Sequence, residues 1–159
     1  WYKLGEKEKT RSDLNEGLRL DPNVAEGLAM RGSLLEELGN GQEAIDDLRR
    51  AVRLEPNDFR YATLLAFLLA TKPEASQQER DEALTLAQFA CQQSESKQGA
   101  ALQTLATVFA ERGDFAAAVE WQKKAVNNSA SKNEKLHHEK VLRAFQAKRT
   151  HRESPVTIR

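Results

Sequence analysis

The residues most able to do chemistry in this sequence are its three histidines, His137, His138 and His151. His137 and His138 are adjacent, so on a helix their side chains point about 100° apart and cannot hold one metal ion from the same face. A carboxylate four residues after His138 would help to complete a zinc site, but that position is Leu142. We therefore predict no metal site and expect both histidines to be solvated residues of a terminal helix.

The single cysteine and the paired carboxylates predict no catalytic centre either. Cys91 lies in an apolar helical stretch with no histidine near it in sequence, so we expect a buried structural thiol rather than a nucleophile. Neighbouring acids on a helix diverge, which predicts that the pairs 36–37 and 46–47 are solvated. The sequence matches no catalytic triad, P-loop or dinucleotide-binding pattern. We expect a protein that is not an enzyme and needs no cofactor.

Composition excludes several further classes of protein. The chain has 159 residues, 24 basic and 24 acidic side chains, 40% hydrophobic residues and one cysteine. This argues against a disulfide-stapled domain, a disordered chain and a dedicated nucleic-acid binder. The longest apolar run, residues 62–70, is about half of the ~20 residues that span a bilayer. We expect one soluble domain without a membrane partner, and a cytoplasmic location is favoured. Because Trp1 stands where a Met would begin a chain, we expect a fragment or a processed product.

Charge is distributed unevenly along the chain. Residues 130–159 carry eight Lys or Arg and three Glu, which gives +5, so the other residues must sum to −5. The basic end could contact nucleic acid, an acidic partner or the acidic part of a second copy. A solvated helical face is the interpretation that we favour.

The sequence repeats itself with a period of 34 residues. The segments 18–23 (LRLDPN) and 52–57 (VRLEPN) are nearly identical, and a glycine stands 17 residues before the proline of each, at Gly5 and Gly39. Apolar residues between these prolines recur at helical spacing. Gly39 is typical of a helix C-terminus, and Asn40 followed by Glu43 is typical of a capping box that starts the next helix. Each repeat is therefore predicted to be a pair of helices.

Small residues occur where the two helices of a repeat must cross closely, at Gly32, Ala44 and Ala51. A 34-residue helix-turn-helix unit with these residues resembles the tetratricopeptide repeat (TPR). The resemblance implies an all-α fold, an α-solenoid in which the repeats form a right-handed superhelix that ends in a capping helix.

Carried onto this sequence, the repeat divides residues 1–149 of the TPR domain into five parts. They are a partial repeat at 1–23, repeats at 24–58, 59–98 and 99–130, and a capping helix at 131–149. In the partial repeat, Gly5 matches the turn between two helices, so we expect the chain to begin inside a first helix. The third repeat carries a five-residue insertion around residues 72–76. Residues 150–159 lack periodicity and are predicted to be a mobile tail.

Three motifs narrow the resemblance to a bacterial subgroup of TPR proteins. They are LLAT-x-P at 68–73, RD-x-A at 80–83 and GDF-x-x-AVEWQ at 113–122. Within the second motif, we expect Asp81 to stabilise the start of a helix through the helix dipole. The subgroup resemblance implies a fold more than a function.

The TPR resemblance implies a concave groove, lined by the first helix of each repeat, that binds a peptide or a helix of a partner protein. The residues expected to point into this groove are Glu26, Ser33, Glu37, Arg60, Thr63, Phe67, Gln103 and Thr107. Phe67 could anchor an apolar side chain of the partner; alternatively, its helix is simply buried, for example under the C-terminal tail. The Lys and Asn clamp that one TPR subclass uses for chaperone tails is absent.

Two other functions stay open at this point. Apolar residues of the truncated first repeat (Trp1, Leu4, Leu14 and Leu18) could drive self-assembly into a homodimer. The repeats could instead be an accessory domain of a larger enzyme or regulatory protein. In each case the partner is a protein or peptide that the sequence does not identify.

Overall fold

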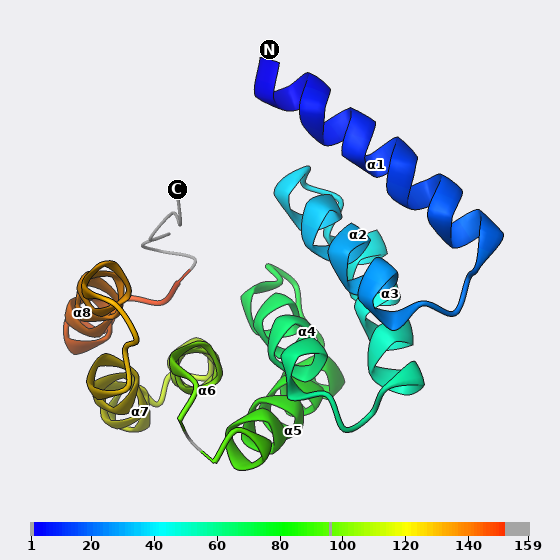
Figure 1. Ribbon diagram of the computed structural model, residues 1–159. Helices are drawn as coiled ribbons and strands as arrows, with labels where there is room; N and C mark the ends of the chain where they lie inside the picture. The colour runs from blue at the N-terminus through cyan, green and yellow to red at the C-terminus, as the bar shows by residue number, and fades with distance from the viewer. Residues whose placement is uncertain (1, 96, 152–159) are drawn as a thin grey trace.

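The computed structural model describes residues 2–95 and 97–151, and these residues form helices and turns with no β-strand (Figure 1). The helices are α1 (Tyr2–Leu20), α2 (Ala25–Glu37), α3 (Gly41–Leu54), α4 (Phe59–Thr71), α5 (Gln77–Gln93), α6 (Gly99–Glu111), α7 (Phe115–Asn127) and α8 (Lys132–Gln146). None of them is long and apolar enough to cross a bilayer within the described part of the chain.

The helices pack in consecutive pairs, and glycine turns close two of these pairs. Gly39 between α2 and α3 and Gly113 between α6 and α7 have φ values of +84° and +86°, which L side chains adopt with strain. In both turns the next amide, Asn40 or Asp114, bonds back to a carbonyl of the preceding helix, at 2.8 and 2.9 Å. The predicted role of Gly39 is therefore confirmed, and the same turn recurs 74 residues later (113 − 39).

Small residues allow the paired helices to approach closely, as the sequence predicts. A Cβ atom on Gly32 would lie 3.1 Å from Leu48 Cγ and 3.2 Å from the Ala44 carbonyl oxygen of the facing helix. Ala44, Leu48 and Ala51 are all fully buried at this crossing. The core continues from pair to pair along the molecule.

The first helix differs from the prediction. Helix α1 is continuous from Tyr2 to Leu20 and runs straight through Gly5, which has no positive φ. The residues that follow Gly5 are rich in Glu and Lys, which favour helix, and one exposed glycine costs only about 1 kcal/mol there. The helix packs on α2 through Leu18, which is buried.

The insertion in the third repeat is shared between a loop and a helix. The loop at 72–76 has five residues where the corresponding loop at 38–40 has three, and α5 has 17 residues where α3 has 14. Helix α5 begins with a capping box: Ser76 Oγ accepts from the Glu79 amide at 3.2 Å, and the Glu79 carboxylate accepts from the Ser76 amide at 2.8 Å. The extra turn is thus stabilised at its own N-terminus.

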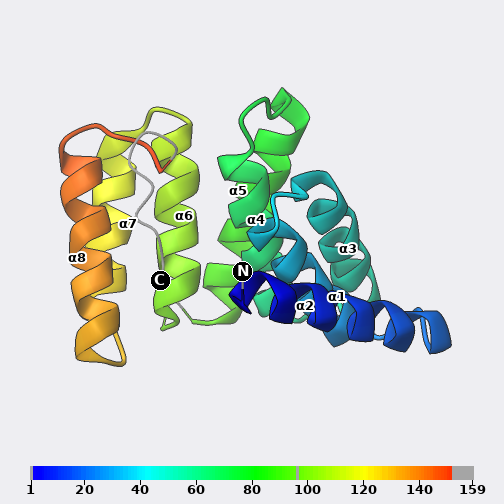
Figure 2. The ribbon, with the colours of Figure 1, turned by 90° about the horizontal axis from the view of Figure 1, so that it is seen from above.

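Together the helices form an all-α helical-repeat solenoid. They follow an arc in which α2, α4, α6 and α8 lie on the inner side and α3, α5 and α7 on the outer side (Figure 1). Helices α6, α7 and α8 stand side by side (Figure 2). The last helix caps this end: Val141 and Phe145 are buried against Ala106, Ala110 and Ala118.

Candidate functional site

The inner side of the arc contains a cleft of about 400 Å³ between α2, α4, α6 and α8. Its middle is apolar and comes from one helix, α4, which contributes Thr63, Leu64, Phe67 and Leu68. Leu64 is 40% exposed, although α4 is the most apolar part of the chain. The hydroxyl of Thr63 donates to the Phe59 carbonyl at 2.7 Å, so the helix satisfies it internally.

One edge of the cleft is acidic and comes from the end of α2. Glu36 and Glu37 are both exposed there, and Ser33 lies one turn earlier. Glu37 forms an ion pair with Lys7 of α1 at 2.7 Å. The carboxylate of Glu36 is therefore the one better placed to attract a cationic group of a ligand.

The opposite edge comes from α8, which contributes Glu134, His137 and His138. The expectation that both histidines are solvated is wrong for His138, which is 3% exposed. Its Nδ1 lies 3.1 Å from the Ala125 carbonyl oxygen and 3.0 Å from Ser129 Oγ. The sequence expectation failed because α8 packs against its neighbours with the histidine side, not only with its apolar residues.

Gly99 permits this close packing of α8. It is the first residue of α6, and a Cβ atom on it would lie 2.7 Å from His138 Cε1 and 2.6 Å from Glu134 Oε1. The glutamate could move aside, but the imidazole is held by its contacts with Ala125 and Ser129. A side chain at position 99 would therefore push α8 away from the cleft.

Two polar atoms at the cleft are buried with no hydrogen-bond partner among the described residues, Gln103 Oε1 and His137 Nε2. Burial is the main reason that the pKa of His137 is lowered, and the adjacent His138 lowers it further. Buried polar atoms without partners are uncommon in folded proteins. They are the polar groups that a bound ligand could satisfy after a small movement of either side chain.

The structure brings together five of the eight residues that the sequence predicts for the groove. Ser33, Glu37, Thr63, Phe67 and Gln103 line the cleft. The other three lie outside it. Glu26 is exposed at the start of α2, Arg60 forms an ion pair with the helix-capping Asp58 at 2.5 Å, and Thr107 is 1% exposed inside the core.

Sequence reasoning missed the contributions of Leu64, Leu68 and α8. The two leucines stand four residues apart, beside the pair Thr63 and Phe67 with the same spacing, so a wider helical stripe could have been recognised. Nothing in the sequence indicates that α8 folds back to face α2.

Phe67 is half-buried, and its ring contacts that of His151, with centroids 5.1 Å apart and planes at 73°. The alternative that the chain after α8 covers this helix is thus supported at one described residue. The rest of the predicted tail, residues 152–159, lies outside the described residues.

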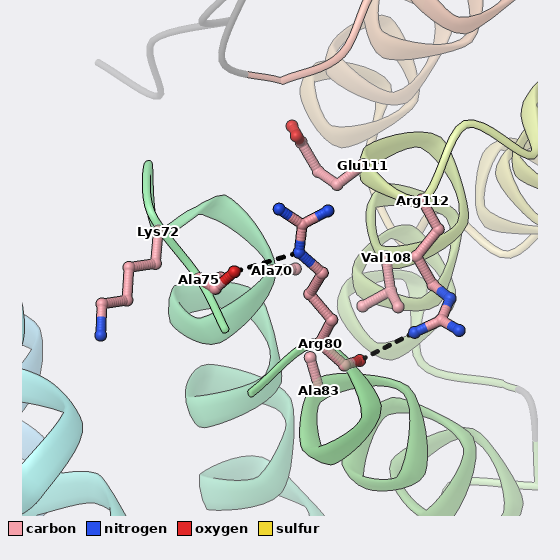
Figure 3. Close-up of a pocket in the computed structure, with 8 residues that line it drawn as sticks. All are labelled: Ala70, Lys72, Ala75, Arg80, Ala83, Val108, Glu111 and Arg112. Carbon is pink, nitrogen blue, oxygen red and sulfur yellow. Dashed lines mark hydrogen bonds between the residues drawn. The ribbon is translucent and has the colours of Figure 1, made fainter. Parts of the chain in front are cut away.

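A second cavity lies between the 72–76 loop, α5 and α6 (Figure 3). Arg80 extends across it, donating from Nε to the Ala75 carbonyl at 3.2 Å, and Arg112 donates to the Arg80 carbonyl at 3.3 Å. Its volume of about 10 Å³ suffices for one water molecule at most. We assign it a structural role in joining α5 to α6.

The other reactive or charged side chains singled out in the sequence have structural roles. Cys91 is buried as predicted, and burial raises the pKa of its thiol to about 11. Asp47 is not solvated as expected: it is 5% exposed and accepts two hydrogen bonds from Arg31, at 2.6 and 2.8 Å. Asp81, expected to stabilise a helix start through the dipole, lies four residues after the first residue of α5, Gln77, and pairs with Arg112 at 2.9 Å.

A family model described as the SusR N-terminal TPR domain matches residues 7–143 of the chain. No curated protein sequence matches it significantly. The three motifs that narrow the resemblance to a bacterial subgroup are not tested by these matches, so the subgroup stays a prediction.

Solved structures share the fold at low sequence identity. A MamA fragment from Desulfovibrio magneticus RS-1 has a TM-score of 0.71 at 20% identity, covering 92% of this chain and 77% of that one. YrrB, described as a TPR protein with an unusual peptide-binding site, has a TM-score of 0.69 at 21% identity, covering 88% and 69%. Yeast Tom70 has a TM-score of 0.70 at 19% identity, covering 90% of this chain but 30% of its own.

Proposed function

This chain belongs to the family of SusR N-terminal TPR domains, and we propose that it is a non-catalytic scaffold for protein–protein interaction. In this proposal, an extended peptide or a helix of a partner binds in the cleft between α2, α4, α6 and α8. The observation that carries the proposal is the cleft itself, with an apolar centre, an acidic edge and buried polar atoms that have no partner among the described residues.

The size and lining of the cleft suit a short peptide segment. Its volume of about 400 Å³ falls in the range of roughly 300–1,000 Å³ that is typical of ligand sites. An apolar side chain of the peptide would contact Leu64 and Phe67, and a neighbouring basic side chain would approach Glu36. The amide of Gln103 could bond to the peptide backbone. YrrB, which shares the fold, is described as having a peptide-binding site, and this supports a peptide as the kind of ligand.

Peptide selection with matched variants tests the proposal. Peptides are selected from a random library on the immobilised chain, and their dissociation constants are then measured by fluorescence anisotropy. Leu64→Glu places a charge in the cleft and should weaken binding at least about tenfold, a loss typical of an interface hot spot. Leu54→Glu is the control, because Leu54 is equally exposed (39% against 40%) but lies at the end of α3, outside the cleft.

Phe67→Ala separates a binding role from a core role of that residue. If Phe67 anchors the partner, the variant loses binding and keeps the melting temperature of the wild type. Selected peptides that bind wild type, Leu64→Glu and Phe67→Ala with equal affinity would show that the cleft is not the binding site.

Self-association at the N-terminal end is a second proposal. Leu18 is buried within the chain, but Leu20 and Val24 are 71% and 42% exposed at the turn from α1 to α2, and Met30, within α2, is 54% exposed. Exposed apolar side chains at one end of a molecule can form an interface with a second copy. Of the residues first expected there, the side chains of Trp1 and Leu4 lie outside the described residues. Sedimentation equilibrium at high concentration tests the idea, and a purely monomeric distribution would contradict it. An accessory role beside other domains also remains a proposal.

A further inference from the structure

The chain returns to the inner side of the arc after α8 through a hydrogen-bonded turn. Lys148 has a φ of +54°, and the amide of Arg149 donates to the carbonyl of Ala144 at 3.0 Å. A residue in the left-handed region with a bond of this kind closes many helix C-termini and redirects the chain. Thr150 and His151, which follow, are both half-buried.

His151 lies against Phe67, one of the residues that line the cleft. Its ring meets that of Phe67 edge-on, at 5.1 Å between centroids, a geometry that aromatic pairs prefer. Burial lowers the pKa of this imidazole, and the carboxylate of Glu111 on α6 acts in the opposite direction. The residue that precedes the segment 152–159 is therefore fixed beside the cleft.

The segment 152–159 has a length and a chemistry that fit the cleft. Its sequence is Arg-Glu-Ser-Pro-Val-Thr-Ile-Arg, and eight extended residues reach roughly 26–29 Å. Because packed helices lie about 8–10 Å apart, the segment can pass from α4 to α2. In an extended chain, Val156 and Ile158 share one side, where they match the apolar centre. The two arginines of the segment match the acidic edge at Glu36.

We propose that residues 152–159 occupy the cleft as an intramolecular ligand, which a partner must displace in order to bind. This inference rests on the proposed function of the same cleft. The segment and the partner then compete for the cleft. The apparent affinity of a partner is its intrinsic affinity multiplied by the fraction of molecules in which the cleft is free.

A fluorophore on the segment can report its docking in the full chain. Cys91 is 3% exposed, so in a Ser154→Cys variant the introduced thiol can be labelled selectively. Docking holds the label, and Glu36→Lys should release it and lower its steady-state anisotropy. Glu120→Lys makes the same charge reversal at an exposed position of α7, outside the cleft, and should leave the anisotropy unchanged.

A second variant places the change on the segment itself. Val156→Asp combined with Ile158→Asp leaves every described residue intact and should lower the anisotropy as Glu36→Lys does. It should also let a library-selected peptide bind up to about tenfold more tightly, if the segment fills the cleft in nine molecules of ten. Unchanged anisotropy in both variants, with unchanged melting temperatures, would overturn the proposal.

The outcomes separate this proposal from the proposed function. A peptide that binds in a Leu64-dependent manner without releasing the label would show that the cleft binds partners while the segment lies elsewhere. A label that is released by Glu36→Lys, in a chain that selects no peptide, would support the intramolecular ligand and count against partner binding.

Discussion

At the scale of single residues, the sequence predicted local conformation correctly where that conformation depends on the backbone of one residue. Gly39 was assigned to a turn from its place in the repeat, and its φ of +84° explains why a glycine stands there. The capping box was predicted at Asn40, whose side chain makes no capping bond, and it occurs instead at Ser76 and Glu79. Both sites carry a capping residue and a glutamate three positions later, so only the final geometry decides which pair bonds.

The acidity of Glu79 leads to a prediction about stability at low pH. Hydrogen bonds from Lys72 and the Ser76 amide lower the pKa of Glu79 from 4.5 to about 2. A carboxyl whose pKa is lowered by folding stabilises the fold above its unfolded pKa, and this contribution is lost as pH falls from about 4.5 towards 2. Glu79→Gln should therefore be less stable than wild type at pH 7, and the difference should shrink across that window.

Urea denaturation at a series of pH values measures this difference. Gln can still accept the capping bond from the Ser76 amide, so the variant tests the effect of the negative charge alone. Glu74→Gln, at an exposed position of the same loop, is the control and should follow the wild-type curve. A constant gap between Glu79→Gln and wild type from pH 7 to pH 2 would refute the assigned role.

At the scale of elements, the helix pairs followed from the sequence but their ends and contacts did not. The small residues at Gly32, Ala44 and Ala51 correctly predicted a close crossing. The break at Gly5 was wrong, because a glycine marks a turn only where packing bends the chain there. Helix α8 was expected to expose its histidines, yet His138 is buried, because its ring packs on Ala125 of α7 and on Ser129, and one polar residue that packs in this way leaves no apolar periodic signal.

Gly99 offers a test of how closely α8 packs on α6. Gly99→Ala would place a methyl group 2.7 Å from His138 Cε1, and overpacking of this kind costs about 1–3 kcal/mol in the free energy of unfolding. Gly17→Ala is the matched control, since a Cβ there meets nothing within 4 Å in α1; it should stabilise by about 0.5–1 kcal/mol. Thermal unfolding of both variants measures these changes. A Gly99→Ala variant as stable as wild type would mean that α8 can shift away from α6 without a loss of stability.

At the scale of the whole molecule, the solenoid was predictable from one 34-residue period, while the full composition of the cleft was not. The period places α2, α4 and α6 on one side, and this identified Ser33, Thr63 and Phe67 as groove residues. It could not show that α8 and the chain beyond it return to that side. That return depends on one turn at Lys148 and on packing between distant helices.

This return makes the docking of the segment 152–159 depend on pH through His151. Burial beside Phe67 lowers the pKa of His151, which favours the neutral imidazole in the docked state. Docking should therefore be strongest above the ordinary pKa of about 6.5 and weaken as pH falls through the lowered value. Among the described residues, the charged and titratable groups that act on His151 or are acted on by it are Glu111 of α6, which opposes the shift, and His137 of α8, whose own pKa is also lowered.

The anisotropy of the label at position 154 should accordingly fall as the pH drops below the ordinary histidine pKa of about 6.5, because the pKa of His151 is lowered. His151→Phe keeps an aromatic ring against Phe67 and has no proton to gain, so its anisotropy should stay high over the same pH range. His137→Gln should retain the fall, because the imidazole that contacts Phe67 is still present. If His137→Gln abolished the fall and His151→Phe preserved it, the pH response would belong to α8 rather than to the docked segment.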